Sequence, residues 1–139
     1  TFDVQPLPGY ASAFVGIISG HHGVARSGRL ILFDPAKARK GAAGMLQEIP
    51  HRNRPIVEEV KDRLVDGVWP QFIKPSPLND TYFLVAAKLD KNDLWGIYLV
   101  DKFDNVTCLH KMEGEGYQSD SRAQNGDSAC YTRPGETGR

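Results

Sequence analysis

Short apolar runs separated by turn residues dominate the hydrophobic pattern over residues 2–116. The runs are rich in β-branched and aromatic residues and are bounded by Pro, Gly, Asn or Asp. They have the length of strands and are too short for typical helices, and their near-continuous hydrophobicity predicts strands covered on both faces. We expect strands within 14–19, 29–33, 44–49, 81–87, 96–100 and 106–110.

Two aspartates stand where an apolar run gives way to a turn. Asp34 precedes a proline, and Asp101 begins the stretch Asp-Lys-Phe-Asp-Asn. Asp and Asn side chains accept hydrogen bonds from their own backbone two residues on, so turn capping explains both aspartates. Another apolar run follows each turn, and no helical pattern lies between the paired runs. The order therefore predicts antiparallel meanders rather than βαβ units.

The segment 52–68 has an ambiguous pattern. Ile56, Val60 and Leu64 recur at helical spacing between charged residues, and Pro55 suits a first helical turn. Residues 57–60 are equally compatible with a strand followed by a loop. Both interpretations stay open.

An internal repeat is the strongest signal in the chain. Pro6-Leu7 precedes the run 14–18, and Pro77-Leu78 precedes the run 82–86. In each half a second strand then ends in an aspartate, followed by a turn and a last strand. Repeated four-stranded meanders are typical of β-propellers, although two blades cannot close a ring. A small sandwich or barrel of short strands is the competing fold.

The repeat divides the chain into four parts. Residues 1–50 form the first predicted blade, 51–68 an insertion and 69–117 the second blade. The stretch 118–139 contains no Val, Ile, Leu, Met, Phe or Trp. Such a stretch buries too little apolar area to offset its ordering entropy, so we expect a disordered or non-native tail. The predicted fold is all-β: two blades of a larger propeller with a disordered tail.

Charge and composition exclude several classes of protein. The chain has 17 Lys and Arg against 17 Asp and Glu, so it lacks the basic excess of a protein that coats nucleic acid. No stretch of apolar residues is long enough to predict a membrane span. Two cysteines, Cys108 and Cys130, are too few for a disulfide scaffold and leave the redox compartment open.

Three segments of the second half, 66–72, 75–85 and 94–101, resemble the blades of TolB-type β-propellers. The shared pattern is a proline before a Ser-Pro-Asp-Gly-like turn, an inner strand, and a strand of the form Ile-Tyr-x-x-Asp. Residues 19–23 and 28–35 narrow the resemblance to a secreted bacterial group whose propeller is similar to the middle domain of the hydrazine synthase alpha subunit. The resemblance covers roughly residues 5–115 and fails in the tail.

The resemblance implies a propeller scaffold and a periplasmic or secreted location, and little chemistry. The domains flanking this propeller in hydrazine synthase carry c-type haems on Cys-x-x-Cys-His motifs. Cys108 is followed by Leu109 and His110 without a neighbouring cysteine, so haem attachment does not carry over. We expect no cofactor.

His21 and His22, in the glycine-rich loop 20–28, are the one candidate ligand or metal site. Adjacent residues on a strand point to opposite faces, so one metal ion cannot easily bind both there. In a loop the two side chains could still converge on a propeller channel. A loop histidine that holds a turn is the competing interpretation.

Familiar catalytic motifs are absent from the sequence. The function predicted first is therefore a non-catalytic scaffold or interaction module within a larger exported propeller. Its partners would be missing blades, adjoining domains or another protein. The alternative is the propeller wall of a redox or hydrolytic site, with His21 and His22 facing the channel.

Overall fold

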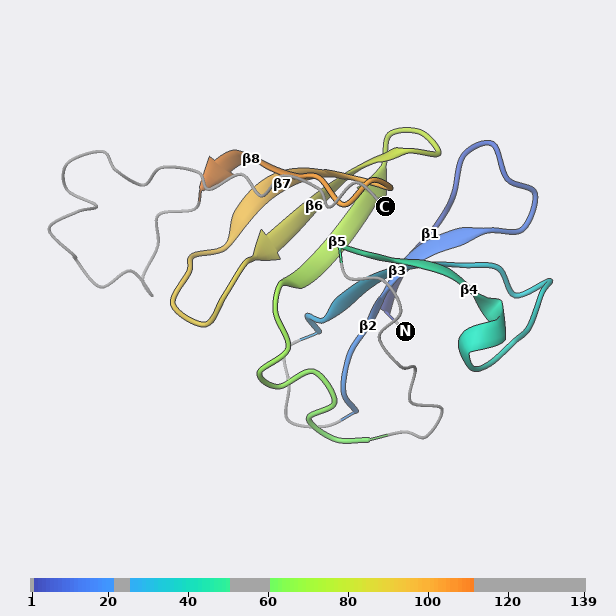
Figure 1. The fold of residues 1–139 in the computed structure, drawn as a ribbon, viewed down its shortest axis with the longest axis horizontal. Coiled ribbons are helices and arrows are strands. Elements are labelled where there is room, and N and C mark those ends of the chain that lie inside the picture. The colour runs from blue at the N-terminus through green and yellow to red at the C-terminus, as the bar shows by residue number, and fades with distance from the viewer. Residues whose placement is uncertain (1, 22–25, 51–60, 112–139) are drawn as a thin grey trace, which may run out of the picture.

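The structure is a computed structural model that describes residues 2–21, 26–50 and 61–111 of the 139-residue chain. The described part is all-β, with eight strands and one short 3-10 turn (Figure 1). The strands are β1 (Phe2–Pro6), β2 (Phe14–Ile18), β3 (Arg29–Phe33), β4 (Met45–Ile49), β5 (Gln71–Pro77), β6 (Tyr82–Lys88), β7 (Gly96–Asp101) and β8 (Val106–Lys111), and the turn η1 is Ala42–Gly44.

The strands form two antiparallel sheets, in which chain order and spatial order agree. The N-terminal sheet has the order β1-β2-β3-β4, and the C-terminal sheet has the order β5-β6-β7-β8. The prediction of two consecutive four-stranded meanders is confirmed. β5 lies against β1, β2 and β3, so the first strand of the second sheet forms most of the backbone contact with the first sheet (Figure 1).

The apolar pattern did not predict β1 and β5 as separate strands. β1 is mostly exposed and ends in a proline, and β5 contains two prolines among polar residues. Such first strands lack the long apolar run of a strand with two covered faces, because one side of each is an edge of its sheet.

The two sheets repeat the same irregularity in their first strand pair. Between Phe2 and Gln5, β1 advances by three residues while β2 advances by two, and β5 and β6 do the same between Ile73 and Ser76. Inside these bulges Asp3 has φ 50° and Lys74 has φ 54°. Positive φ is uncommon outside glycine, so its recurrence at one position supports the internal repeat.

Turn hydrogen bonds extend the correspondence. The Leu7 N–H donates to the Ala13 carbonyl at 2.9 Å, and the Leu78 N–H donates to the Tyr82 carbonyl at 2.9 Å. Leu7 therefore corresponds to Leu78, and Ala13 to Tyr82. It follows that Phe14 corresponds to Phe83, one residue later than a comparison of 14–18 with 82–86 implies.

One hydrophobic core lies between the sheets. The N-terminal sheet contributes Val15 and Ile17 from β2 and Leu30 and Leu32 from β3. The C-terminal sheet contributes the three aromatic residues Phe72, Phe83 and Tyr98, and also Val85 and Val100, to the same cluster. These side chains alternate along their strands with residues of the opposite face.

The sheets meet through faces that are not equivalent. Because Phe14 corresponds to Phe83, the core residue Val15 corresponds to Leu84, which lies on the face of the C-terminal sheet that points away from the core. The packing is therefore head-to-tail, whereas a sandwich of two sheets related by a two-fold axis would join equivalent faces.

The segment between the sheets is described only from residue 61. Residues 62–67 form turns, in which the Asp66 N–H donates to the Arg63 carbonyl at 3.1 Å and the Val68 N–H to the Val65 carbonyl at 3.0 Å. The helix and strand alternatives for residues 52–60 lie outside the described residues, as does the predicted tail 118–139.

Candidate functional site

His21 lies just after β2, at the start of the connection to β3, and is exposed. Its backbone N–H donates to the Lys61 carbonyl at 3.0 Å, which ties this connection to the segment that leads to the second sheet. His22 lies outside the described residues. Among the residues that the structure describes, no group of three His, Cys, Asp or Glu could hold a metal ion.

The two aspartates predicted to cap turns do so. Asp34 Oδ1 accepts from the Ala36 N–H at 2.9 Å and from the Ser12 hydroxyl at 2.8 Å. Asp101 Oδ1 accepts from the Phe103 and Asn105 N–H groups at 2.8 and 3.1 Å. These side chains organise the equivalent turns β3–β4 and β7–β8.

A buried ion pair crosses from β3 to β4. The Arg29 guanidinium donates from Nε to Glu48 Oε1 at 2.8 Å and from Nη2 to Oε2 at 2.7 Å, and both side chains are buried. This two-point geometry fits a planar guanidinium to a carboxylate. With its charges enclosed, the pair acts as a structural element rather than as a substrate site.

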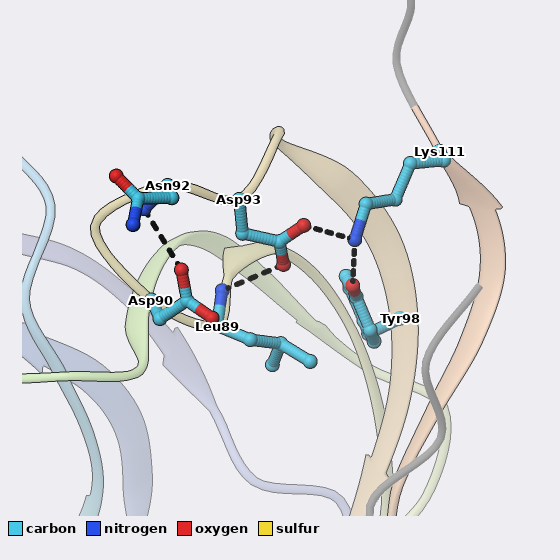
Figure 2. Close-up of polar contacts among 6 residues, drawn as sticks. All are labelled: Leu89, Asp90, Asn92, Asp93, Tyr98 and Lys111. Carbon is cyan, nitrogen blue, oxygen red and sulfur yellow. Dashed lines mark hydrogen bonds and ion pairs between the residues drawn. The ribbon is translucent and has the colours of Figure 1, made fainter. Parts of the chain in front are cut away.

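A second polar cluster, built around the buried Tyr98, closes one end of the C-terminal sheet. Figure 2 shows Lys111, the last residue of β8, between Asp93 of the β6–β7 turn and the phenol of Tyr98 on β7. The Lys111 ammonium pairs with Asp93 Oδ1 and donates to the Tyr98 oxygen at 3.2 Å. Asp93 Oδ2 accepts from the Leu89 N–H at 3.2 Å, so one carboxylate fixes both the turn and the strand end.

Burial and contact set the protonation of this cluster. Burial raises the pKa of Tyr98 above 10.0, against the opposing effect of Lys111. For Lys111 burial alone would lower the pKa, but the hydrogen bonds to Asp93 and Tyr98 outweigh it and raise the pKa above 10.5. The cluster thus holds a charged lysine and a neutral phenol, the wrong protonation states for a nucleophile or general base near neutral pH.

Backbone and side-chain hydrogen bonds join the two sheets at the start of β3. Gly28 and Phe72 exchange two backbone bonds, from Gly28 N to Phe72 O at 3.1 Å and from Phe72 N to Gly28 O at 2.8 Å. The Ser27 hydroxyl donates to Gln71 Oε1 at 2.5 Å beside this bridge. A Cβ at position 28 would overlap the carbonyl oxygen of Ile18, so the bridge needs glycine.

The β7–β8 turn makes a second set of contacts with the first sheet, away from the bridge at Gly28. Gln47 Nε2 on β4 donates to the Lys102 carbonyl at 2.5 Å. The Lys102 ammonium lies 4.8 Å from the ring centroid of Tyr10 and donates to its hydroxyl at 3.0 Å. The β7–β8 turn of the second sheet therefore contacts residues of the first sheet and of its β1–β2 loop.

Cys108 on β8 is disulfide-bonded, which the count of two cysteines did not predict. The other cysteine of the chain, Cys130, lies outside the described residues. Disulfides persist mainly in oxidising compartments.

Sequence reasoning missed both polar clusters, the Arg29–Glu48 pair and the contacts of Lys111 with Asp93 and Tyr98. A single charged residue, Arg29, at the start of an apolar run gives no sign of burial. Glu48 lies between Gln47 and Ile49 in an ordinary strand pattern. The one available signal was a charged residue inside the predicted strands 29–33 and 44–49, since charges are almost never fully buried unless they are paired.

Comparison of the chain with protein-family profiles, curated proteins and solved structures returns no match. No helix among the described residues has the length and apolarity needed to cross a bilayer.

Proposed function

We propose that this chain is a non-catalytic scaffold or interaction module, namely two blades of a larger, exported β-propeller of the TolB-like type. The observation that carries the proposal is the head-to-tail packing of two equivalent meanders. A propeller is built from four-stranded meanders repeated around an axis, and successive blades meet through non-equivalent faces.

Three features support the repeat as the unit of assembly. The bulges at Asp3 and Lys74 recur at one position and meet each other, with Lys74 N donating to Asp3 Oδ2 at 3.3 Å. The turns at Asp34 and Asp101 use the same capping bond to the backbone two residues on. β5, the first strand of the second unit, lies beside β1, β2 and β3 of the first unit.

The chemistry of the described residues favours a scaffold over an enzyme. The buried Arg29 pairs with the buried Glu48, and the half-buried Lys111 pairs with Asp93, so these charges are used inside the fold. The alternative with His21 and His22 at a channel is tested by His21→Ala and His22→Ala variants in a metal-binding assay. Metal bound by the parent chain and lost in both variants would favour that alternative.

The disulfide at Cys108 supports export to an oxidising compartment. In the periplasmic or secreted protein, Cys108 should resist alkylation until a reductant is added. Immediate alkylation of Cys108 in freshly isolated native protein would count against export.

The test of the proposal is whether the full chain is complete by itself. A part of a larger propeller presents apolar area and binds the dye ANS under native conditions, and its unfolding free energy lies at or below about 5 kcal/mol, the low end for natural domains. A monomer that binds no ANS and unfolds cooperatively well above that value would be a self-sufficient sandwich, and the proposal would fail.

A further inference from the structure

The apolar face of the C-terminal sheet that points away from the core carries Tyr82, Leu84, Ala86, Ile97 and Leu99, and we call it the outer face. The register pairs Leu84 with Leu99 and Ala86 with Ile97 across β6 and β7, so these side chains form one continuous patch. The same face carries Asp101 at the end of β7 and Lys88 at the end of β6, and the five uncharged residues lie between these two ends of the sheet.

Each of these positions has an equivalent in the N-terminal sheet, and there the equivalent is buried. Leu7 is 2% exposed, whereas its counterpart Leu78, in the turn beside the outer face, is 54% exposed. Ala13 is 2% exposed against 41% for Tyr82, and Leu30 is 0% exposed against 37% for Ile97. The same three positions of the repeat are therefore covered in one sheet and open in the other.

The cover in the N-terminal sheet is the C-terminal sheet itself. Leu7, Ala13 and Leu30 belong to the core cluster that also holds Phe72, Phe83 and other side chains of β5–β7. At the equivalent positions of the C-terminal sheet, Leu78, Tyr82 and Ile97 are exposed. A solvent-adapted sheet would place polar residues there.

We infer that the outer face of the C-terminal sheet is the docking surface for a third four-stranded antiparallel sheet, which stands to β5–β8 as β5–β8 stand to β1–β4. This inference rests on the proposed function and deepens it by naming the surface and the chemistry of its partner. The occupant presents aromatic and β-branched side chains at the positions of Phe83, Val85, Tyr98 and Val100, because those residues fill the equivalent interface within the chain.

A second copy of this chain is a less suitable occupant. It would have to dock through the face of its N-terminal sheet that points away from the core, which carries Arg29 and Ile31. Both of these residues are already buried, together with Glu48 opposite Ile31. The partner sheet must therefore come from other polypeptide, joined to this chain or separate from it.

The test supplies such a sheet to the full chain. The chain is extended at its C-terminus by a copy of its own residues 62–111, which raises the effective concentration of the copy to the millimolar range. Ile97→Cys in the original sheet reports cover through its rate of maleimide labelling, followed by mass spectrometry. Phe103→Cys is the matched control, because its equivalent Ala36 is exposed in the covered sheet.

We expect the extension to slow labelling of Ile97→Cys at least tenfold and to leave Phe103→Cys unchanged. Phe83→Asp with Val100→Asp in the copy removes its docking face and should restore fast labelling. A copy that leaves Ile97→Cys equally reactive, whether the copy folds or not, overturns the inference. Protection of Ile97→Cys in the unextended chain that grows with protein concentration also overturns it, in favour of self-association.

These outcomes separate the inference from the proposed function. ANS binding by the unextended chain together with an unprotected Ile97→Cys in the extended chain would keep the larger assembly and discard this docking face. Absence of ANS binding would discard the larger assembly itself.

Discussion

The two sheets share one backbone plan but stabilise it with different side chains. Both have a bulge in the first strand and an aspartate-capped turn between the third and fourth strands. On the third strand, however, Arg29 of the N-terminal sheet stands where the C-terminal sheet has Gly96, and Glu48 stands where that sheet has Cys108. The backbone geometry is therefore repeated in the two sheets, whereas the polar side chains at equivalent positions differ between them.

The sheets also differ in how they are covered. Arg29, Leu30, Ile31 and Leu32 are all buried, so β3 is enclosed on both sides. β7 alternates between buried and open positions. The comparison teaches that the enclosed sheet holds its buried charges as a two-point pair, whereas the half-open sheet places Lys111 at a strand end.

The largest expected effect comes from breaking the ion pair of the enclosed sheet. Glu48→Gln or Arg29→Met removes one charge of the two-point contact between these residues, and because both side chains are buried the loss should cost about 3–5 kcal/mol of unfolding free energy. Urea denaturation measures the loss. The double variant Arg29→Met with Glu48→Leu should recover to within about 1 kcal/mol of the parent chain. A double variant as unstable as either single variant would show that the loss of unfolding free energy does not come from breaking the ion pair.

The bridge between the sheets is the next most sensitive point. Gly28→Ala forces the backbone away from Ile18, and we expect a loss of about 3 kcal/mol with faster hydrogen exchange at the Phe72 amide. Gly67→Ala is the control: its added Cβ meets nothing within 4 Å, although φ is 72°. Equal exchange at Phe72 in both variants would contradict a specific role for the bridge.

The capped turns test the equivalence of the repeats with a smaller effect. Asp34→Ala and Asp101→Ala each remove a capping bond and should cost about 1–2 kcal/mol. Asp101→Asn keeps an oxygen for the Phe103 and Asn105 N–H groups, so thermal unfolding should show a smaller loss for it than for Asp101→Ala. A large loss of stability at one aspartate and none at the other would show that the two turns are not equivalent.

The smallest effect concerns pH and only the C-terminal sheet. Because the pKa values of Tyr98 and Lys111 are raised on folding, the folded state holds more protons than the unfolded state above pH about 10. The stabilisation is fully present below the unfolded pKa values and is lost as pH rises through the folded ones. Urea midpoints should be flat near neutral pH and fall above about pH 10.

Tyr98→Phe removes one of the two titrating groups and is the control for this alkaline loss. It should make the fall with pH shallower while lowering stability at neutral pH by about 1 kcal/mol, the value of one hydrogen bond. An unchanged slope would assign the alkaline loss to other groups.

Much of the fold followed from the sequence, because apolar runs bounded by turn residues encode strands locally. The runs at 14–18 and 96–101 and the caps at Asp34 and Asp101 need only their neighbours to be recognised. The bulges at Asp3 and Lys74 did not follow, since no local signal marks a positive φ at an aspartate or a lysine. Each bulge shifts the register of its strand pair by one residue.

The candidate site was less predictable than the fold. The histidine pair drew attention by residue type alone, and the structure describes only His21, at the surface. The docking face is a relation between two sheets: Leu78 and Tyr82 look like ordinary strand residues until their counterparts Leu7 and Ala13 are seen buried. That comparison needs the three-dimensional register.

The head-to-tail stack is tested most directly by comparing two equivalent positions in the same native chain. Leu30→Cys and Ile97→Cys are labelled separately with maleimide, and the labelled peptides are quantified by mass spectrometry. The stack predicts that Ile97→Cys reacts at least a hundredfold faster, because Leu30 is reached only by opening the sheet interface. Comparable rates at the two positions would contradict it.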